Sequence, residues 1–247
     1  MSRRALVIGG GTGLGLASAA ALAAEGARVA ISGRRADVLE AALASLPGTG
    51  HCALPGDARS EDEMTRVADA AAAAFGGLDA VVVSAGNSAI GTAETMPLAA
   101  FLDMVRDNLA PPFLAAKCTP RHFPAEGGAM VLIASVFGVV GYPERVAYST
   151  AKAGVIGMVR ALALDLAPRR IRVNAVSPSL VLTPLARAVM AREPDPAATL
   201  ARRAAQHPIG RLGEPQDVAA MVAHLCSDRG SWITGQNMVI DGGLSVP

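Results

Sequence analysis

Residues 5–15 read Ala5-Leu6-Val7-Ile8-Gly9-Gly10-Gly11-Thr12-Gly13-Leu14-Gly15, four apolar residues that run directly into a glycine cluster. The apolar run predicts a buried strand, and a helical pattern follows the glycines. Glycine permits positive φ and lets backbone come close to a pyrophosphate. The N-terminus of the following helix offers free N–H groups to that anion. The segment therefore predicts a strand–turn–helix unit that binds a nucleotide, with a plain tight turn as the alternative.

The rest of the chain alternates short apolar runs with longer helical patterns. Strands are predicted over 5–8, 28–32, 51–55, 80–84, 129–134, 172–177 and 238–240, and helices over 13–25, 36–45, 60–75, 97–117, 148–167 and 214–227. Most strands are apolar along their whole length, as in a parallel sheet covered on both faces. We therefore expect one domain over 1–247, a doubly wound, Rossmann-type α/β fold with a parallel seven-stranded sheet and helices on both faces. This context favours the nucleotide over the plain turn.

Composition and charge exclude several classes of protein. The chain has 247 residues, of which 51% are hydrophobic, and a formal net charge of +1, which argues against a nucleic-acid face. Cys52, Cys118 and Cys226 stand singly, which argues against a disulfide framework and a metal site. Four apolar residues near the start are too few for a signal peptide, and no apolar run is long enough for a membrane span. We expect a cytoplasmic protein without a membrane or nucleic-acid partner.

Residues 183–207 interrupt the alternation. They contain Pro184, Pro194, Pro196 and several arginines. A long insertion near the carboxyl end of a sheet is often a lid over a substrate. We interpret 183–207 as a substrate lid, with a solvated pair of helices as the alternative.

The end of the second predicted strand bears on the choice of cofactor. It reads Ile31-Ser32-Gly33-Arg34-Arg35, with no carboxylate to hold the ribose 2′-hydroxyl of NAD. Arginine suits a 2′-phosphate because its planar fork binds phosphate oxygens in pairs. NADP (NADPH) is therefore favoured and NAD remains possible, while a solvated arginine pair is the alternative interpretation. Asp57, after the third strand, could accept a bond from an adenine amine or serve as a turn residue.

Four residues form a candidate catalytic group. Tyr148 and Lys152 are four positions apart and so share one helical face. A lysine ammonium beside a phenol is expected to lower the phenol's pKa, which lets it exchange a proton with a substrate oxygen. Ser135 follows a strand, and Asn108 lies within a predicted helix where an amide is a poor helix former. All lie at the rim where open α/β sheets bind ligands, as does the small Ser84-Ala85-Gly86.

These motifs together resemble the short-chain dehydrogenase/reductase family over nearly the full length of the chain. The matching residues are Gly9, Gly13, Gly15, Asp57, Ser84-Ala85-Gly86, Asn108, Ser135, Tyr148, Lys152, Asn174-Ala175-Val176-Ser177-Pro178, Gly210-Arg211-Leu212-Gly213-Glu214-Pro215, Thr234-Gly235-Gln236 and Asp241-Gly242-Gly243. Their order and spacing make a chance match implausible.

The resemblance implies an NAD(P)-dependent oxidoreductase that transfers a hydride between the nicotinamide and a ketone or secondary alcohol. Tyr148 would be the general acid or base, Lys152 would lower its pKa and bind the nicotinamide ribose, Ser135 would polarise the carbonyl, and Asn108 would hold a relay water. The implied cofactor contacts are Gly9, Gly11, Thr12, Gly13, Leu14, Gly15, Gly33, Arg34, Arg35, Asp57, Ala58, Ser84, Ala85, Gly86, Tyr148, Lys152, Pro178, Leu180, Val181 and Thr183. The family also implies a homo-oligomer, with a tetramer favoured over a dimer. A catalytically silent NAD(P)-binding regulatory protein, or an NAD-preferring dehydrogenase, is the alternative.

Three positions depart from the family's usual pattern. Ile8 stands where threonine is usual, Ser84 where asparagine is usual, and Ser179 where glycine is usual. None of them removes a catalytic group. The expected substrate walls, 136–142, 87–91 and 180–182, are mostly small or apolar, which favours an uncharged substrate. Arg187, Arg192, Arg202 and Arg203 of the lid could instead meet an anion, although a solvated helix face also explains them.

Overall fold

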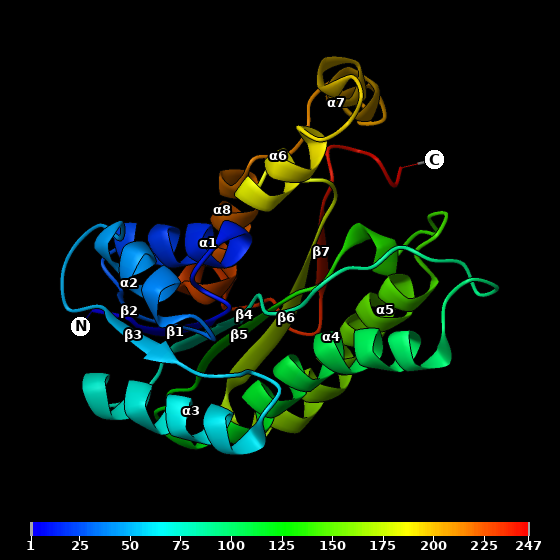
Figure 1. Ribbon diagram of the computed structural model, residues 1–247. Coiled ribbons are helices and arrows are strands. Elements are labelled where there is room, and N and C mark those ends of the chain that lie inside the picture. Colours follow the sequence, from blue (N-terminus) through cyan, green and yellow to red (C-terminus); the bar gives the residue numbers. More distant parts are fainter. Residues whose placement is uncertain (1, 247) are drawn as a thin grey trace.

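A single parallel sheet lies at the centre of the computed structural model, which describes residues 2–246. Its seven strands follow the order β3-β2-β1-β4-β5-β6-β7, and each neighbouring pair is parallel (Figure 1). The strands are β1 (Arg4–Ile8), β2 (Arg28–Gly33), β3 (Cys52–Pro55), β4 (Ala80–Val83), β5 (Gly128–Ile133), β6 (Ile171–Pro178) and β7 (Asn237–Ile240). The order reverses direction between β1 and β4, which is where such sheets bind ligands.

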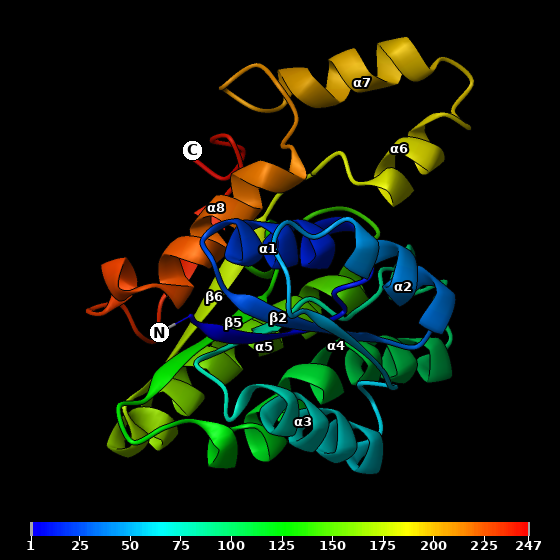
Figure 2. The same ribbon diagram turned by 90° about the vertical axis from the view of Figure 1, so that its left-hand side faces the viewer.

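Helices cover both faces of the sheet (Figure 2). One layer holds α3 (Glu61–Phe75), α4 (Leu98–Cys118) and α5 (Val146–Leu166), and the other holds α1 (Gly13–Ala24), α2 (Ala36–Ala44) and α8 (Pro215–Cys226). Two further helices, α6 (Pro184–Met190) and α7 (Pro196–Ala205), stand apart from both layers, beyond the carboxyl end of β6. Short 3-10 turns occupy Pro120–His122, Val136–Gly138, Ala167–Arg169 and Asp228–Gly230.

The alternation of side chains along each strand divides the core into two clusters. Leu6 and Ile8 of β1 pack toward α3, α4 and α5, while Ala5 and Val7 pack toward α1, α2 and α8. All four are 1% exposed or less. Because both faces of the sheet are covered, a strand without polar residues is the stable choice here, and each large aliphatic side chain buried contributes roughly 1.5–3 kcal/mol.

The predicted fold class and the parallel seven-stranded sheet are confirmed, and each predicted strand and helix occurs within a few residues of its expected bounds. Helix α5 begins at Val146, two residues before Tyr148. The 183–207 segment contains a pair of helices, α6 and α7. No helix in the described part of the chain combines the length and the hydropathy needed to cross a membrane.

Candidate active site

A cavity of about 960 Å³ opens at the carboxyl ends of the strands, between the sheet and the α6–α7 segment. Asn108, Ser135, Tyr148 and Lys152 all line it. Of the predicted cofactor contacts, every one lines the cavity except Gly15. The sequence therefore identified positions that the fold brings together from eight separate segments of the chain.

The glycine turn after β1 is shaped by backbone contacts. The N–H groups of Gly9 and Gly10 both donate to the carbonyl oxygen of Ser32, at 2.8 and 3.1 Å. Gly9 has a φ of +82°, and a Cβ added there would lie 2.7 Å from the main-chain nitrogen of Ala85. A Cβ on Gly15 would lie 2.0 Å from the oxygen of Gly9. Gly15 thus lets α1 approach the glycine turn and does not face the cavity. Gly9 lets the same turn pack against the backbone of Ala85, which follows β4.

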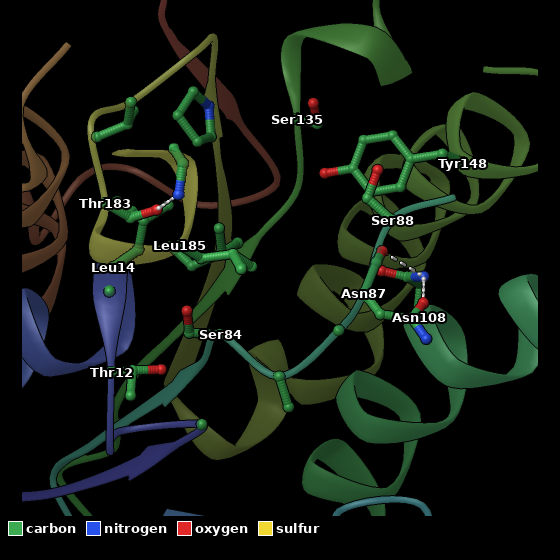
Figure 3. A pocket seen from close by; sticks show the side chains of 18 of the residues that line it. Thr12, Leu14, Ser84, Asn87, Ser88, Asn108, Ser135, Tyr148, Thr183 and Leu185 are labelled. Carbon is green, nitrogen blue, oxygen red and sulfur yellow. Dashed lines mark hydrogen bonds between the residues drawn. The ribbon is translucent and has the colours of Figure 1, made fainter. Parts of the chain in front are cut away.

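The cradle fits the pyrophosphate of a dinucleotide. Gly11, Thr12 and Gly13 line the cavity at the N-terminus of α1, where unpaired N–H groups and the helix dipole favour an anion. Thr183 closes this region from the opposite side, because a Cβ on Gly13 would come 3.4 Å from its Cγ2 atom. Figure 3 shows Thr183 beside Leu14 at the same place.

The far end of the cavity carries Arg34, Arg35 and an ion-paired network. Asp57 accepts hydrogen bonds from the Arg59 main-chain N–H at 3.0 Å and from its guanidinium at 2.7 Å. The guanidinium of Arg59 holds the pKa of Asp57 down at about 2. Arg59 also reaches Asp107 at 3.2 Å. Asp57 therefore serves as a turn residue before α3 and also lines the cavity, and its contact with an adenine amine stays a prediction.

Tyr148 and Lys152 project from the first two turns of α5, as their spacing predicts. The Lys152 Nζ atom lies 5.7 Å from the centre of the Tyr148 ring and donates to the oxygen of Ile133 at 2.9 Å. Lys152 is 6% exposed, and burial lowers its pKa to about 8. A buried lysine loses hydration that its charged form needs.

The expectation that the pKa of Tyr148 is lowered is wrong for this structure. Burial raises it, and the opposing effects of the Ser135 hydroxyl and the Arg145 guanidinium are smaller. Desolvation dominates because the phenolate would have to form in a low-dielectric site. The ammonium of Lys152 meanwhile bonds Ile133 rather than the phenol oxygen.

Ser135 is held by the turn that follows β5. Its Oγ accepts a hydrogen bond from the N–H of Phe137 at 3.2 Å and caps the 3-10 turn over Val136–Gly138. The side chain is buried, and Figure 3 shows the Tyr148 hydroxyl pointing into the space that Ser135 borders. A substrate oxygen in that space would meet two hydroxyl groups.

Asn108 has a structural reason for its place inside α4. Its Nδ2 donates to the oxygens of Met104 at 3.0 Å and Asn87 at 3.1 Å, and Figure 3 draws the bonds to Asn87. Its Oδ1 is buried and has no hydrogen-bond partner among the described residues. A Cβ on Gly86 would lie 2.6 Å from this Oδ1 and 3.6 Å from Lys152 Nζ. Glycine thus preserves a space that both polar atoms face.

Two prolines follow Asn108 within the helix. Pro111 and Pro112 carry no N–H, so the carbonyls of Asp107 and Asn108 receive no helical hydrogen bond from them. The main-chain oxygen of Asn108 and its Oδ1 therefore both lack a helical or side-chain donor in the described part of the chain, and a bound water could donate to either of them.

The substrate side of the cavity is only partly as predicted. Of the expected walls, Val136, Phe137, Tyr142, Asn87, Ser88, Leu180 and Val181 line it, whereas 138–141, 89–91 and Leu182 do not. Sequence reasoning missed Arg145, three residues before Tyr148, and Leu244 near the C-terminus. A basic residue three positions before the predicted catalytic tyrosine was a visible signal for Arg145, but nothing in the sequence marked Leu244.

Ser179, which stands where glycine is usual in the family, adopts an unstrained backbone. Its φ is not positive, and its Oγ lies 3.0 Å from the Nε2 of His207, which is buried at the end of the α6–α7 segment. The Nδ1 of His207 lies 2.9 Å from the oxygen of Arg203. The hydroxyl that replaces the family's glycine therefore ties the end of β6 to the segment above the cavity.

The fold and this cavity define an α/β protein that binds a nucleotide at the switch point of a doubly wound sheet. A family model described as enoyl-(acyl carrier protein) reductase matches residues 9–245. The chain is 38% identical to cis-4-hydroxycyclohexanecarboxylate dehydrogenase of Sinomonas cyclohexanicum, over 98% of this chain and 96% of the relative. It is 35% identical to carbonyl reductase family member 4 of Danio rerio, over 100% of this chain and 99% of the relative.

Solved structures agree with the sequence matches. A variant of actinorhodin polyketide ketoreductase with NADPH superposes with a TM-score of 0.93 and 33% identity, covering 100% of this chain and 98% of that one. The chain belongs to the short-chain dehydrogenase/reductase family. It is an NAD(P)-dependent enzyme of that family, whose members act on CH–OH and C=O groups.

Proposed function

We propose that the protein exchanges a hydride between NADPH and a ketone or secondary alcohol, with Tyr148 as general acid or base. The observation that carries the proposal is that Ser135, Tyr148, Lys152 and Asn108 line the same cavity as the glycine turn. A bound nicotinamide would supply or accept the hydride, which is chemistry that no side chain offers.

Ser135 and Tyr148 act on the substrate oxygen. In ketone reduction the Ser135 hydroxyl donates to the carbonyl oxygen and polarises it, and Tyr148 delivers a proton to that oxygen. In alcohol oxidation Tyr148 takes the proton back. A neutral phenol, which burial favours here, is the form needed to donate.

Lys152 and Asn108 return the proton to Tyr148. The ammonium of Lys152 faces the Tyr148 ring, and its positive charge would favour the phenolate left after proton transfer. The Asn108 Oδ1 and carbonyl would hold a water beside Lys152, in the space that Gly86 leaves. Proton exchange with solvent would run along this route.

The preference for NADPH over NADH rests on Arg34 and Arg35. Both line the cavity beyond Gly33, and the residues that end β2 include no carboxylate to accept a bond from the ribose 2′-hydroxyl of NADH. Guanidinium groups bind a 2′-phosphate by paired, charge-assisted hydrogen bonds. The NADPH in the crystals of the actinorhodin polyketide ketoreductase variant supports this preference.

The protein is also proposed to be a cytoplasmic homotetramer that works on a small molecule. Large apolar side chains are exposed on α4 and α5, namely Leu98, Leu102, Phe113 and Leu164, and Trp232 is 99% exposed. A second copy would cover them. Light scattering should give four times the chain mass, and a monomer mass would reject the assembly.

The Tyr148→Phe variant tests the function. It removes the exchangeable proton and keeps the ring, so turnover with a panel of ketones and NADPH should fall by roughly 10²–10⁴-fold. NADPH affinity should change little. Full activity in the variant would refute the mechanism, and binding of NADPH without turnover by the unaltered protein would indicate a catalytically silent regulatory protein.

A further inference from the structure

Two arginines with no acidic partner face the substrate half of the cavity. Arg145 lies at the N-terminus of α5, and Arg203 lies in the last turn of α7. Neither forms an ion pair with any carboxylate within 2–246. Glu193, which also lines the cavity, is exposed and is among the carboxylates that form no ion pair with either arginine. A half-buried guanidinium without a counter-ion attracts an anion from solution.

The Arg203 guanidinium is fixed against the wall that carries Ser135. Its Nη1 donates to the hydroxyl of Tyr142, and the Tyr142 ring stacks on Phe137 with ring centres 4.5 Å apart. Phe137 in turn donates its N–H to Ser135 Oγ. A guanidinium has five N–H donors, and the structure assigns one of them, so a planar fork remains for a ligand.

Arg145 adds positive charge closer to the reacting atoms. Its Nη1 donates to Ser88 Oγ at 3.0 Å and to the Ala89 oxygen at 3.3 Å, both neutral acceptors. Its charge also opposes, in part, the rise that burial causes in the pKa of Tyr148.

The other lid arginines do not share these properties. Arg187 is paired with Glu214 through two contacts of 2.9 Å. Arg192 and Arg202 are exposed and do not line the cavity. Of the four lid arginines singled out in the sequence, Arg203 is the one with both access to the cavity and an uncompensated charge.

We propose that the substrate is an organic acid whose carbinol or ketone carbon lies at Ser135 and Tyr148 and whose carboxylate is bound by Arg203. This inference rests on the proposed function of the same site. The carboxylate takes no part in bond making: hydride and proton go to the carbonyl carbon and oxygen as for a neutral ketone. Arg145 supports the anion by its charge, which no ion pair within 2–246 offsets.

A purely structural role for Arg203 makes a different prediction. If its bond to Tyr142 only ties α7 to the cavity wall, losing the guanidinium would affect charged and neutral substrates alike. If Arg203 binds the substrate, the loss falls on the acid alone. Matched acid and ester pairs therefore separate the two roles.

The test compares Arg203→Gln with Arg202→Gln, its exposed neighbour on the same helix. Binding of 4-oxopentanoate, 5-oxohexanoate and 6-oxoheptanoate to the enzyme with NADP⁺ is measured by calorimetry beside their methyl esters, and kcat/KM is measured with NADPH. In the unaltered protein and Arg202→Gln, at least one acid should exceed its ester by tenfold or more in both measurements. Arg203→Gln should bring that ratio close to one.

Two outcomes overturn the proposal. An acid-to-ester ratio near one in the unaltered protein would show that the cavity has no site for the carboxylate. A high ratio that persists in Arg203→Gln would show that another residue binds the carboxylate. Tyr142→Phe removes the Tyr142 hydroxyl and keeps the Arg203 guanidinium, so this variant should retain the preference for acids. Loss of that preference in Tyr142→Phe would show that Arg203 only tethers α7 to the cavity wall. Failure of the proposed function would look different, because no ester, acid or neutral ketone would then be reduced.

Discussion

The ammonium group of Lys152 donates a hydrogen bond to the main-chain oxygen of Ile133, the last residue of β5, at 2.9 Å. This contact joins a helix side chain to the strand end that leads into Ser135. It is a single neutral acceptor for a charge that is otherwise removed from water, so it only partly offsets the loss of hydration.

The first prediction concerns the stability of the cofactor-free protein at alkaline pH. Lys152 has a folded-state pKa of about 8, below its ordinary value of 10.5, so between these values the unfolded chain holds a proton that the folded chain has lost. The free energy of unfolding should therefore rise with pH in this window, relative to Lys152→Met, by about 3 kcal/mol in total. Urea unfolding of both proteins at several pH values from 7 to 10.5 measures this difference.

Comparison with Lys152→Met removes the contributions of other alkaline groups, including Tyr148 and Cys226, whose pKa values burial raises. A difference between the two proteins that stays constant across the window would show that Lys152 titrates normally in the folded state.

The sequence predicted the sheet well because its strands are buried on both faces. β4 reads Ala80-Val81-Val82-Val83 and is fully buried. A short run of apolar, mostly β-branched residues is typical of a strand covered on both faces. The glycine turn was equally predictable from the sequence, because backbone atoms lie so close to Gly9 and Gly15 that no residue with a Cβ would fit there. Both features depend on residues that are adjacent in the chain, so the sequence alone indicates them.

The second prediction concerns the space between Asn108 and Lys152. A methyl group at Gly86 would come 2.6 Å from Asn108 Oδ1, so Gly86→Ala should displace the amide or the water it holds. We expect kcat to fall by about tenfold or more, with a smaller change in KM, as expected for a proton-transfer step worth roughly 10²–10⁴.

Gly157→Ala is the matched control for Gly86→Ala. A Cβ at Gly157, in the middle of α5, meets no atom within 4 Å. That variant should keep kcat and gain up to about 1 kcal/mol of stability from helix propensity. An unchanged kcat in Gly86→Ala, with the fold intact, would contradict a role for this space in proton transfer.

The third prediction concerns cofactor choice. Gly33 lines the cavity, and a Cβ there meets only Leu39 Cδ2 at 3.6 Å, so an aspartate fits. Gly33→Asp should shift the ratio of kcat/KM for NADPH over NADH toward NADH by tenfold or more, because the carboxylate accepts ribose hydroxyls and repels a 2′-phosphate. Arg34→Ala should weaken NADPH binding and leave NADH binding nearly unchanged, and equal losses for both cofactors would remove Arg34 from the phosphate site.

The substrate side was harder to predict because it depends on contacts between segments far apart in the chain. Arg203 meets Tyr142 across 61 positions, and Arg145 meets Ser88 across 57. Four lid arginines looked alike in the sequence, and only the fold shows that Arg187 is neutralised by Glu214 while Arg203 is not. The predicted direction of the shift in the Tyr148 pKa was also wrong. Spacing indicates which residues are neighbours, but not how much water remains around them.

The last prediction concerns two half-buried serines whose replacement by alanine should affect stability differently. Ser179 Oγ lies 3.0 Å from His207 Nε2, so Ser179→Ala leaves a buried ring nitrogen without its partner and should cost about 1–3 kcal/mol of stability. Ser149 Oγ is buried and has no partner in the described chain, so Ser149→Ala should be neutral or slightly stabilising. Urea unfolding measures both, and limited proteolysis should cut within 183–207 faster in Ser179→Ala, since the tie between β6 and this segment is lost. Equal stability of the two variants would mean that the Ser179–His207 contact does not hold the segment over the cavity.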